Sequence, residues 1–293
     1  MYMISVMKRS VSLLLTAALA SGVSAHKHEP RPSYLRQSPE PSATKSWTLI
    51  WSDEFNGADG SAPDPSRWTY ETGGKGWGND ELECYTNRLR NAQIRGGNLV
   101  ITAQKENIAC SDGLSSHYSS ARLKTQGLFS QAYGRFEARI KIPAGQGMWP
   151  AFWMLGNDIT TNGWPACGEI DIMENIGKEP GTVHGSLHGP GTTSLTSDAT
   201  STFTLPSGQN LADSFHLYAV EWEPGVVRFY LDTNLYATFT QSRWPAGGTW
   251  VFDHPFFILL NVAVGGKWPA SPNRTTVFPQ RMLVDYVRVY RKQ

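Results

Sequence analysis

Short strand-like runs separated by turn residues are the feature that most constrains the fold of this chain. Between residues 46 and 293, breaks such as Gly96-Gly97, Pro143-Ala144-Gly145 and Glu223-Pro224-Gly225 divide runs of alternating or β-branched side chains. No segment keeps a 3.6-residue apolar period for three turns. The pattern predicts an all-β protein in which two antiparallel sheets pack as a sandwich. The strands that we expect are Trp47–Trp51, Asn98–Ala103, Arg135–Ile142, Glu169–Met173, Thr182–His188, His216–Glu223, Val226–Leu231, Phe256–Val262 and Val284–Tyr290.

Composition supports this class and excludes others. Only 17% of residues are charged, and the chain has 28 glycines and 18 prolines, which disfavours helical bundles and coiled coils. Lysine and arginine together number 26 against 25 acidic residues, and no basic run is present, so we expect no nucleic-acid partner. An apolar fraction of 40% disfavours disorder.

The first 45 residues are expected to precede the folded domain. Lys8 and Arg9 come before an apolar run from Val11 to about Ala20, and Val23-Ser24-Ala25 supplies the small residues of a secretory cleavage site. That run is too short to span a bilayer, so we expect residues 1–25 to be a signal peptide, with a signal anchor as the alternative. Residues 26–45 contain four prolines, which predicts a flexible leader. The mature protein is then expected to be secreted to the extracellular space, free of the membrane and monomeric.

Three cysteines, Cys84, Cys110 and Cys167, suit an oxidising compartment with one disulfide and one free thiol. Cys84 with Cys110 is the favoured pair, because a single intervening strand could return the chain to its neighbour; the other pairings stay open. No two cysteines have the close spacing of metal ligands. Asn273-Arg274-Thr275 is an N-glycosylation sequon, so a glycan is expected at Asn273.

Acidic residues at 169, 171 and 174 give the clearest chemical signal. Side chains alternate along a strand, so Glu169 and Asp171 would share one face while Ile170 and Ile172 point inward. Strict alternation would bury Glu174. A β-bulge at Ile172-Met173 would return it to the face of the other two acids.

Such a trio could perform acid and nucleophile chemistry. Two glutamates that lean inward could bring their carboxyls to about 5–5.5 Å, the separation that retaining glycosidases use. Like charges at that distance cannot all ionise easily, so one glutamic acid should remain protonated. The alternative is a solvated outer strand that is merely acidic.

Two tryptophans reinforce the catalytic interpretation. Trp149 and Trp153 lie two strand periods apart and would project from one face as a flat surface for sugar rings, although both could instead be core residues. Pro150 lies between them, and a proline has no N–H for a central strand. We therefore do not expect this segment to be a central, fully paired strand, and we expect at least one indole to be exposed.

The chain resembles glycoside hydrolase family 16 across almost all of residues 46–293. Glu169-Ile170-Asp171-Ile172-Met173-Glu174 looks like the family's E-x-D-x-x-E signature, in the bulged form typical of laminarinase-like endo-β-1,3-glucanases. Further matches follow in the family's order: residues 51–55 (WSDEF), 77–82 (WGNDEL), 134–139 (GRFEAR), 149–153 (WPAFW), 261–266 (NVAVGG) and 285–290 (DYVRVY).

The resemblance implies a β-jelly-roll sandwich with a concave cleft for a glucan chain. It implies that Glu169 is the nucleophile, that Asp171 orients and tunes it, and that Glu174 is the general acid/base of a retaining endo-β-1,3-glucanase, which could also cut mixed β-1,3-1,4 glucan. No cofactor is required for this catalysis. The residues that match or lie near sugar subsites are Asn79, Arg122, Trp149, Trp153, His188 and Trp268.

Three further expectations come from the same resemblance. Some members hold a structural calcium ion, for which the matching positions are Glu54, the Gly97 carbonyl and Asp285. A non-catalytic β-glucan-binding domain of this fold is an alternative, although the presence of both glutamates disfavours it. A transglycosylase is another, since a sugar hydroxyl can capture the same covalent intermediate.

Overall fold

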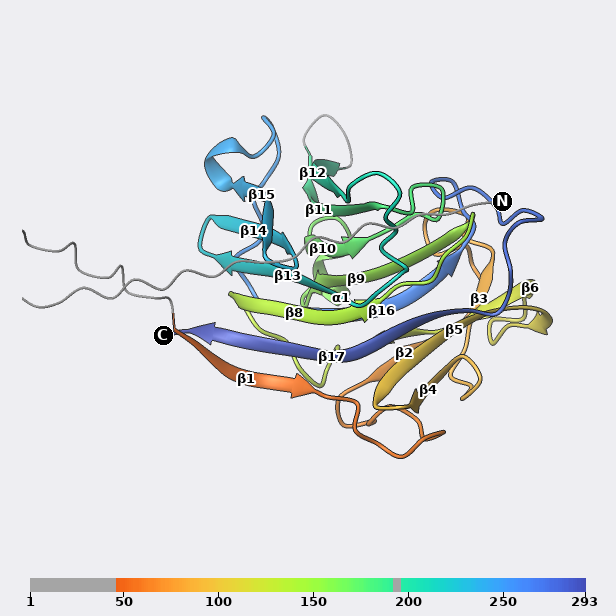
Figure 1. Ribbon diagram of the computed structural model, residues 1–293. Helices are drawn as coiled ribbons and strands as arrows, with labels where there is room; N and C mark the ends of the chain where they lie inside the picture. The colour runs from red at the N-terminus through yellow and green to blue at the C-terminus, as the bar shows by residue number, and fades with distance from the viewer. Residues whose placement is uncertain (1–45, 192–195) are drawn as a thin grey trace, which may run out of the picture. The chain divides into compact units, whose positions relative to one another are not determined.

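The structure, a computed structural model, describes residues 46–191 and 196–293, and nearly all regular structure in them is strand (Figure 1). The predicted signal peptide and leader lie outside the described residues. None of the helices in these two ranges is long and apolar enough to cross a membrane. The helical segments are α1 (Ile159–Asn162) and the 3-10 turn η1 (Gln241–Arg243).

The strands form two sheets. The order of the first is β15-β14-β13-β8-β17-β5-β6-β3, with β1 paired to β17 and β4 to β5; the second has the order β12-β11-β10-β9-β16-β7-β2. Only β3 and β6 pair in parallel among the strand pairs of the described chain; the others are antiparallel. The strands of the ten-stranded sheet are β1 (Trp47–Asp53), β3 (Glu83–Tyr85), β4 (Ala92–Arg95), β5 (Asn98–Ala109), β6 (Ser115–Ser120), β8 (Gly134–Lys141), β13 (His216–Glu223), β14 (Val226–Leu231), β15 (Asn234–Thr240) and β17 (Gln280–Lys292). Those of the seven-stranded sheet are β2 (Thr69–Glu71), β7 (Arg122–Lys124), β9 (Met148–Gly156), β10 (Glu169–Glu174), β11 (Thr182–Pro190), β12 (Thr196–Thr204) and β16 (Phe256–Val264).

A single large apolar cluster fills the space between the sheets. Phe152 and Ile170 of the seven-stranded sheet belong to it together with Phe136 and Trp222 of the ten-stranded sheet, and none of these side chains is exposed. Alternation along each strand sends every second side chain into this cluster. The predicted sandwich of two packed, mainly antiparallel sheets is thus confirmed.

The nine predicted strands are all present, β13 and β14 with the predicted ends and the other seven with shifted ends. The expectation that the Trp149–Trp153 segment is not a central strand is wrong. This segment is part of β9, a central strand that pairs with both β10 and β16. Pro150 lies just beyond the last pair of the β9–β10 ladder, Ala151 with Glu174, and its carbonyl accepts a bond from the Asn175 N–H. Its missing N–H faces the same side, so the proline lies at the end of this ladder and not within it.

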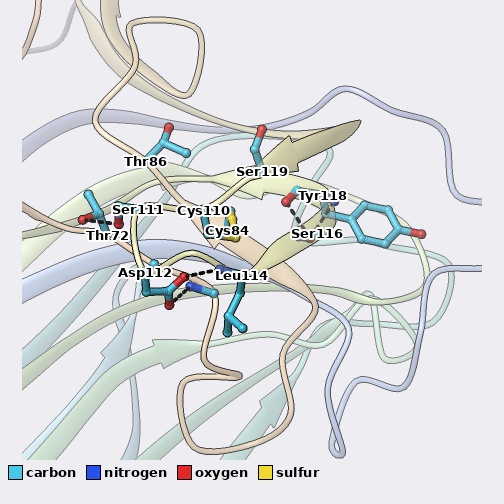
Figure 2. The surroundings of a disulfide bond; sticks show 12 residues. Thr72, Cys84, Thr86, Cys110, Ser111, Asp112, Leu114, Ser116, Tyr118 and Ser119 are labelled. Atoms are coloured by element: carbon cyan, nitrogen blue, oxygen red, sulfur yellow. Dashed lines mark hydrogen bonds between the residues drawn. A yellow bond between two sulfur atoms is a disulfide. The ribbon is translucent and has the colours of Figure 1, made fainter.

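The disulfide joins Cys84 to Cys110, the pair favoured from the sequence, and Cys167 is free and buried. Figure 2 shows the bridge between β3 and the turn that follows β5, where Asp112 accepts a bond from the Gly74 N–H at 2.8 Å. A Cβ on Gly74 would lie 2.6 Å from the Cys110 sulfur, so a glycine is needed for the chain to pass the bridge. The bridge therefore fixes both β3 and the segment that leads to Trp77.

Candidate active site

A cleft of about 890 Å³ lies on the face of the seven-stranded sheet that points away from the core. Neighbouring strands each contribute alternate residues, and their intervening residues are in the core. On β9, for example, Trp149 and Trp153 line the cleft while Phe152 and Met154 are fully buried. The lining also includes residues of β7, β10, β11, β12 and β16, and of the loops around Asn79 and Trp164.

The predicted β-bulge is present in β10. Against β9, Asp171 pairs with Trp153 but Met173 pairs with Phe152, so Ile172 is the extra residue. Against β11, the register also shifts between Asp171 and Glu174. Ile172 and Met173 are both fully buried, and Glu174 lines the cleft with Glu169 and Asp171. The extra residue therefore returns the third acid to the cleft face.

Indole groups hold the two glutamates. Trp164 donates from Nε1 to Glu169 Oε2 at 2.6 Å, and Trp149 donates from Nε1 to Glu174 Oε1 at 2.9 Å. Trp149 in turn packs edge-on against Trp268, with ring centroids 5.3 Å apart. Each glutamate is thus oriented by a rigid aromatic donor.

Asp171 belongs to a row of charges that leads away from the glutamates. Its Oδ2 lies 3.0 Å from His188 Nε2, and His188 Nδ1 lies 2.7 Å from Asp198 Oδ1 on β12. Asp171 is 2% exposed, so its charge is held in a site with little water. An imidazolium between two carboxylates supplies the positive charge that this acidic group needs.

Burial and mutual repulsion raise the pKa values of all three acids. Burial is the largest cause for each; for Glu169 the neighbouring Asp171 adds to it, and for Asp171 the neighbouring Glu174 does. The pKa of Glu174 rises to about 7, through burial and then the charge of Glu169. Burial lowers the pKa of His188, but the bond to Asp171 and the charges and bonds of Asp171, Glu169 and Asp198 together outweigh it and raise the pKa to about 11. The site therefore holds at least one protonated acid near neutral pH, together with a charged histidine.

Metal binding is not needed to satisfy this cluster. Among the described residues, one oxygen each of Glu169 and Asp171 and a nitrogen of His188 lie within 4.8 Å of one another, which a metal ion could occupy. His188 already bonds Asp171 directly, so the charges are compensated by the chain itself. The arrangement fits acid, base and nucleophile chemistry on carboxyl groups.

Comparison with known proteins identifies the family. Residues 79–288 match the family model of glycosyl hydrolases family 16. The chain belongs to this family.

Close relatives are named as glucan-degrading enzymes. A beta-glucanase of Rhodothermus marinus is 42% identical over 254 residues, covering 84% of this chain and 85% of the relative. Glucan endo-1,3-beta-glucosidase A1 of Niallia circulans is 37% identical over 87% of this chain, which spans only 39% of that longer protein. The crystal structure of the laminarinase catalytic domain from Thermotoga maritima superposes with a TM-score of 0.79 at 45% identity, covering 85% of this chain and all of that domain.

The family 16 fold brings all the predicted catalytic and sugar-binding residues into one cleft. The nine lining residues predicted from the sequence are Asn79, Arg122, Trp149, Trp153, Glu169, Asp171, Glu174, His188 and Trp268. Arg122 lies between two indoles, 5.0 Å from the Trp77 ring centroid and 4.7 Å from that of Trp153, while its Nε is paired with Glu71. Its guanidinium is therefore part of an aromatic wall.

Sequence reasoning missed several residues of this cleft that contact the predicted ones, among them Trp164, Asp198 and Asn261. Trp164 lies in a loop without periodicity, and Asp198 lies on a strand that was not predicted. Asn261 was quoted only as part of a motif, yet its Oδ1 accepts the Trp153 indole N–H at 2.7 Å. The one sequence signal that could have found it is that Asn261 is the single polar residue in the apolar run Phe256–Val264.

The calcium positions are occupied by ion pairs. Glu54 accepts bonds from Arg288 on both carboxylate oxygens, at 2.9 and 2.8 Å. Asp285 accepts a bond from Arg139 at 2.7 Å. A calcium ion would have to displace or share both guanidinium groups, so the arrangement does not fit the ion as it stands and no catalytic step depends on it.

Proposed function

We propose that this family 16 glycoside hydrolase is an endo-acting β-glucanase that cuts β-1,3 linkages and also accepts mixed β-1,3-1,4 glucan. The observation that carries the proposal is the bulge in β10, which presents Glu169, Asp171 and Glu174 together in an aromatic cleft. The names of the relatives support the substrate class.

The reaction proceeds in two steps with retention of configuration. Glu174 gives its proton to the glycosidic oxygen while the Glu169 carboxylate attacks the anomeric carbon, so the C–O bond to the leaving chain breaks and an ester to Glu169 forms. Glu174, now ionised, takes a proton from water, which attacks the same carbon and releases Glu169. The charged His188, paired with Asp171, lowers the pKa of Glu169 and so favours its ionised, nucleophilic form.

Digestion of two polysaccharides tests the function. We expect the purified protein to release oligosaccharides of several sizes from laminarin, the mark of endo attack, and from barley β-glucan. Release of nothing from either would overturn the enzyme proposal. Products longer than an oligosaccharide starting material would instead show transglycosylation.

The role of Glu169 has its own test. Glu169→Ala removes the nucleophile but leaves the tryptophan wall, so we expect turnover of laminarin to fall by at least about 10³-fold while glucan binding is retained. Turnover and binding are measured by reducing-sugar release and by calorimetry with intact glucan. Unchanged turnover would reject Glu169 as the nucleophile.

Secretion, a monomeric state and a glycan at Asn273 are also part of this proposal. The sequence of residues 1–25 supports secretion, and the exposed position of Asn273 supports the glycan. Amino-terminal sequencing of protein from the culture medium should begin at His26. Gel filtration checks the monomeric state, and mass spectrometry checks the glycan at Asn273. We do not propose a structural calcium at Glu54, Gly97 and Asp285, because arginines pair with both carboxylates. A melting temperature raised by added calcium and lowered by chelator would contradict this.

A further inference from the structure

A row of buried hydrogen bonds runs beneath one wall of the cleft. Trp153 donates from Nε1 to Asn261 Oδ1 at 2.7 Å, and Asn261 donates from Nδ2 to the Tyr85 hydroxyl at 3.0 Å. Asn261 is 6% exposed and Tyr85 2%, so water cannot replace these partners easily.

The direction of this row is fixed by its first member. An indole N–H can only donate, so Asn261 must turn its oxygen to Trp153 and its amide nitrogen to Tyr85. The Tyr85 hydroxyl then accepts from Asn261, and its own proton must point elsewhere. The neighbouring carboxyl is that of Glu83, two residues away on β3, and its buried Oε1 has no hydrogen-bond partner among the described residues, so it is the acceptor available to that proton.

Glu83 is a buried acid that the catalytic mechanism does not use. Its side chain is fully buried, and its Oε2 accepts the backbone N–H of Val264 at 2.6 Å. Burial raises the pKa of Glu83 to about 8, while the bond from the Val264 N–H acts in the opposite direction. Glu83 and Tyr85 are two residues apart on β3, the strand that the disulfide holds in place.

The row connects this acid to the sugar-facing wall. The Arg122 guanidinium lies over the Trp153 ring as well as the Trp77 ring, so the Trp153 indole helps to hold Arg122 in place, together with Trp77 and the ion pair to Glu71. At the other end, Val264 is the last residue of β16 and leads through Gly265-Gly266 to Trp268, which also lines the cleft.

We propose that Glu83, Tyr85 and Asn261 are positioning residues that lock the Trp153 indole, and with it Arg122, into a rigid wall for a bound glucan chain. The proposal rests on the glucanase function proposed above. The three residues act through Trp153 and not on the bond that breaks, so their loss should weaken substrate binding more than it slows turnover.

Tyr85→Phe tests the proposal, because it removes one hydroxyl and little volume. We expect the KM for laminarin to rise about fivefold, the size of effect that follows from one lost hydrogen bond, while kcat stays within about twofold. The indole ¹⁵N–¹H resonance of Trp153, assigned through Trp153→Phe, should also shift. Tyr218→Phe is the matched control: Tyr218 is a fully buried tyrosine on β13 of the other sheet, and the same change there should alter neither KM nor that resonance.

The possible outcomes are distinguishable. Wild-type protein that does not cleave laminarin would overturn the proposed function, whereas the Trp153 resonance would still test the row of hydrogen bonds. An active wild type with an unchanged KM and an unmoved resonance in Tyr85→Phe would overturn the positioning role. Should Tyr85→Phe not fold, Glu83→Gln takes its place: its amide turns a donor toward Tyr85 or Val264, so the same two shifts are expected and their absence overturns the role.

Discussion

At the scale of single residues, the three buried acids of the cleft lower the stability of the folded protein when they are ionised. Each of the three carboxyls on β10 has a raised pKa because burial and like charges oppose its ionised form. The same environment keeps a proton available on Glu174 near neutral pH, as an acid catalyst requires. The cost in stability and the catalytic function thus have one physical origin.

This linkage gives a prediction for Glu174→Gln. The pKa of Glu174 rises from 4.5 to about 7 on folding, so the unfolded chain loses this proton first as pH increases. The wild type should therefore lose stability between about pH 4.5 and pH 7, and remain less stable above that range. A glutamine does not ionise, so we expect the variant to gain about 2–3 kcal/mol in free energy of unfolding at pH 8 and almost nothing at pH 4.

Urea unfolding at the two pH values measures the difference. Asp80→Asn is the control: the Asp80 side chain is 76% exposed, so the same acid-to-amide change there should give no pH-dependent gain. An equal gain for Glu174→Gln at pH 4 and pH 8 would contradict the explanation.

At the scale of elements, two local devices aim residues at the cleft. The extra residue in β10 turns Glu174 outward, and the bridge between Cys84 and Cys110 fixes β3 beside the turn after β5 (Figure 2). The first acts through backbone register. The second restricts the unfolded chain, since it closes a loop between residues 26 apart in the sequence.

Replacement of both bridged cysteines by alanine should lower the free energy of unfolding by about 3 kcal/mol, as expected for a loop of this length. Because β3 carries Glu83 and Tyr85, we also expect a higher KM for laminarin. Chemical unfolding under non-reducing conditions gives the first value, and initial rates give the second. Cys167→Ala is the control, because it removes a buried thiol but no cross-link. If it lowers the free energy of unfolding as much as the double variant does, the cross-link is not the cause.

At the scale of the whole molecule, one core serves both sheets. Its members come from both of the sheets in Figure 1. Within the described ranges, the other buried apolar cluster is a small one of Leu155, Cys167, Phe257 and Leu259. Removing side chains on the inner face should therefore affect the entire fold, whereas the outer face of the seven-stranded sheet is available for chemistry.

Phe152→Ala tests this shared core. Phe152 lies on β9 next to Trp153 but points inward and is fully buried, so its truncation should cost about 3–5 kcal/mol. Unfolding followed by tryptophan fluorescence and by circular dichroism should give coincident transitions at a lower denaturant concentration. Two separated transitions would show that the sheets unfold independently.

The sequence by itself determined the sandwich class, the nine main strands and the acid trio, because alternation with period two and a one-residue bulge are local properties of the chain. It also pointed to the family, through motifs in order. Only the tertiary structure decided that the strand carrying Trp149 and Trp153 is central, that Trp164 and Asp198 contact the predicted residues, and that arginines hold Glu54 and Asp285. Those facts depend on which distant strands and loops become neighbours, and side-chain contacts across such neighbours leave no periodic signal in a single sequence.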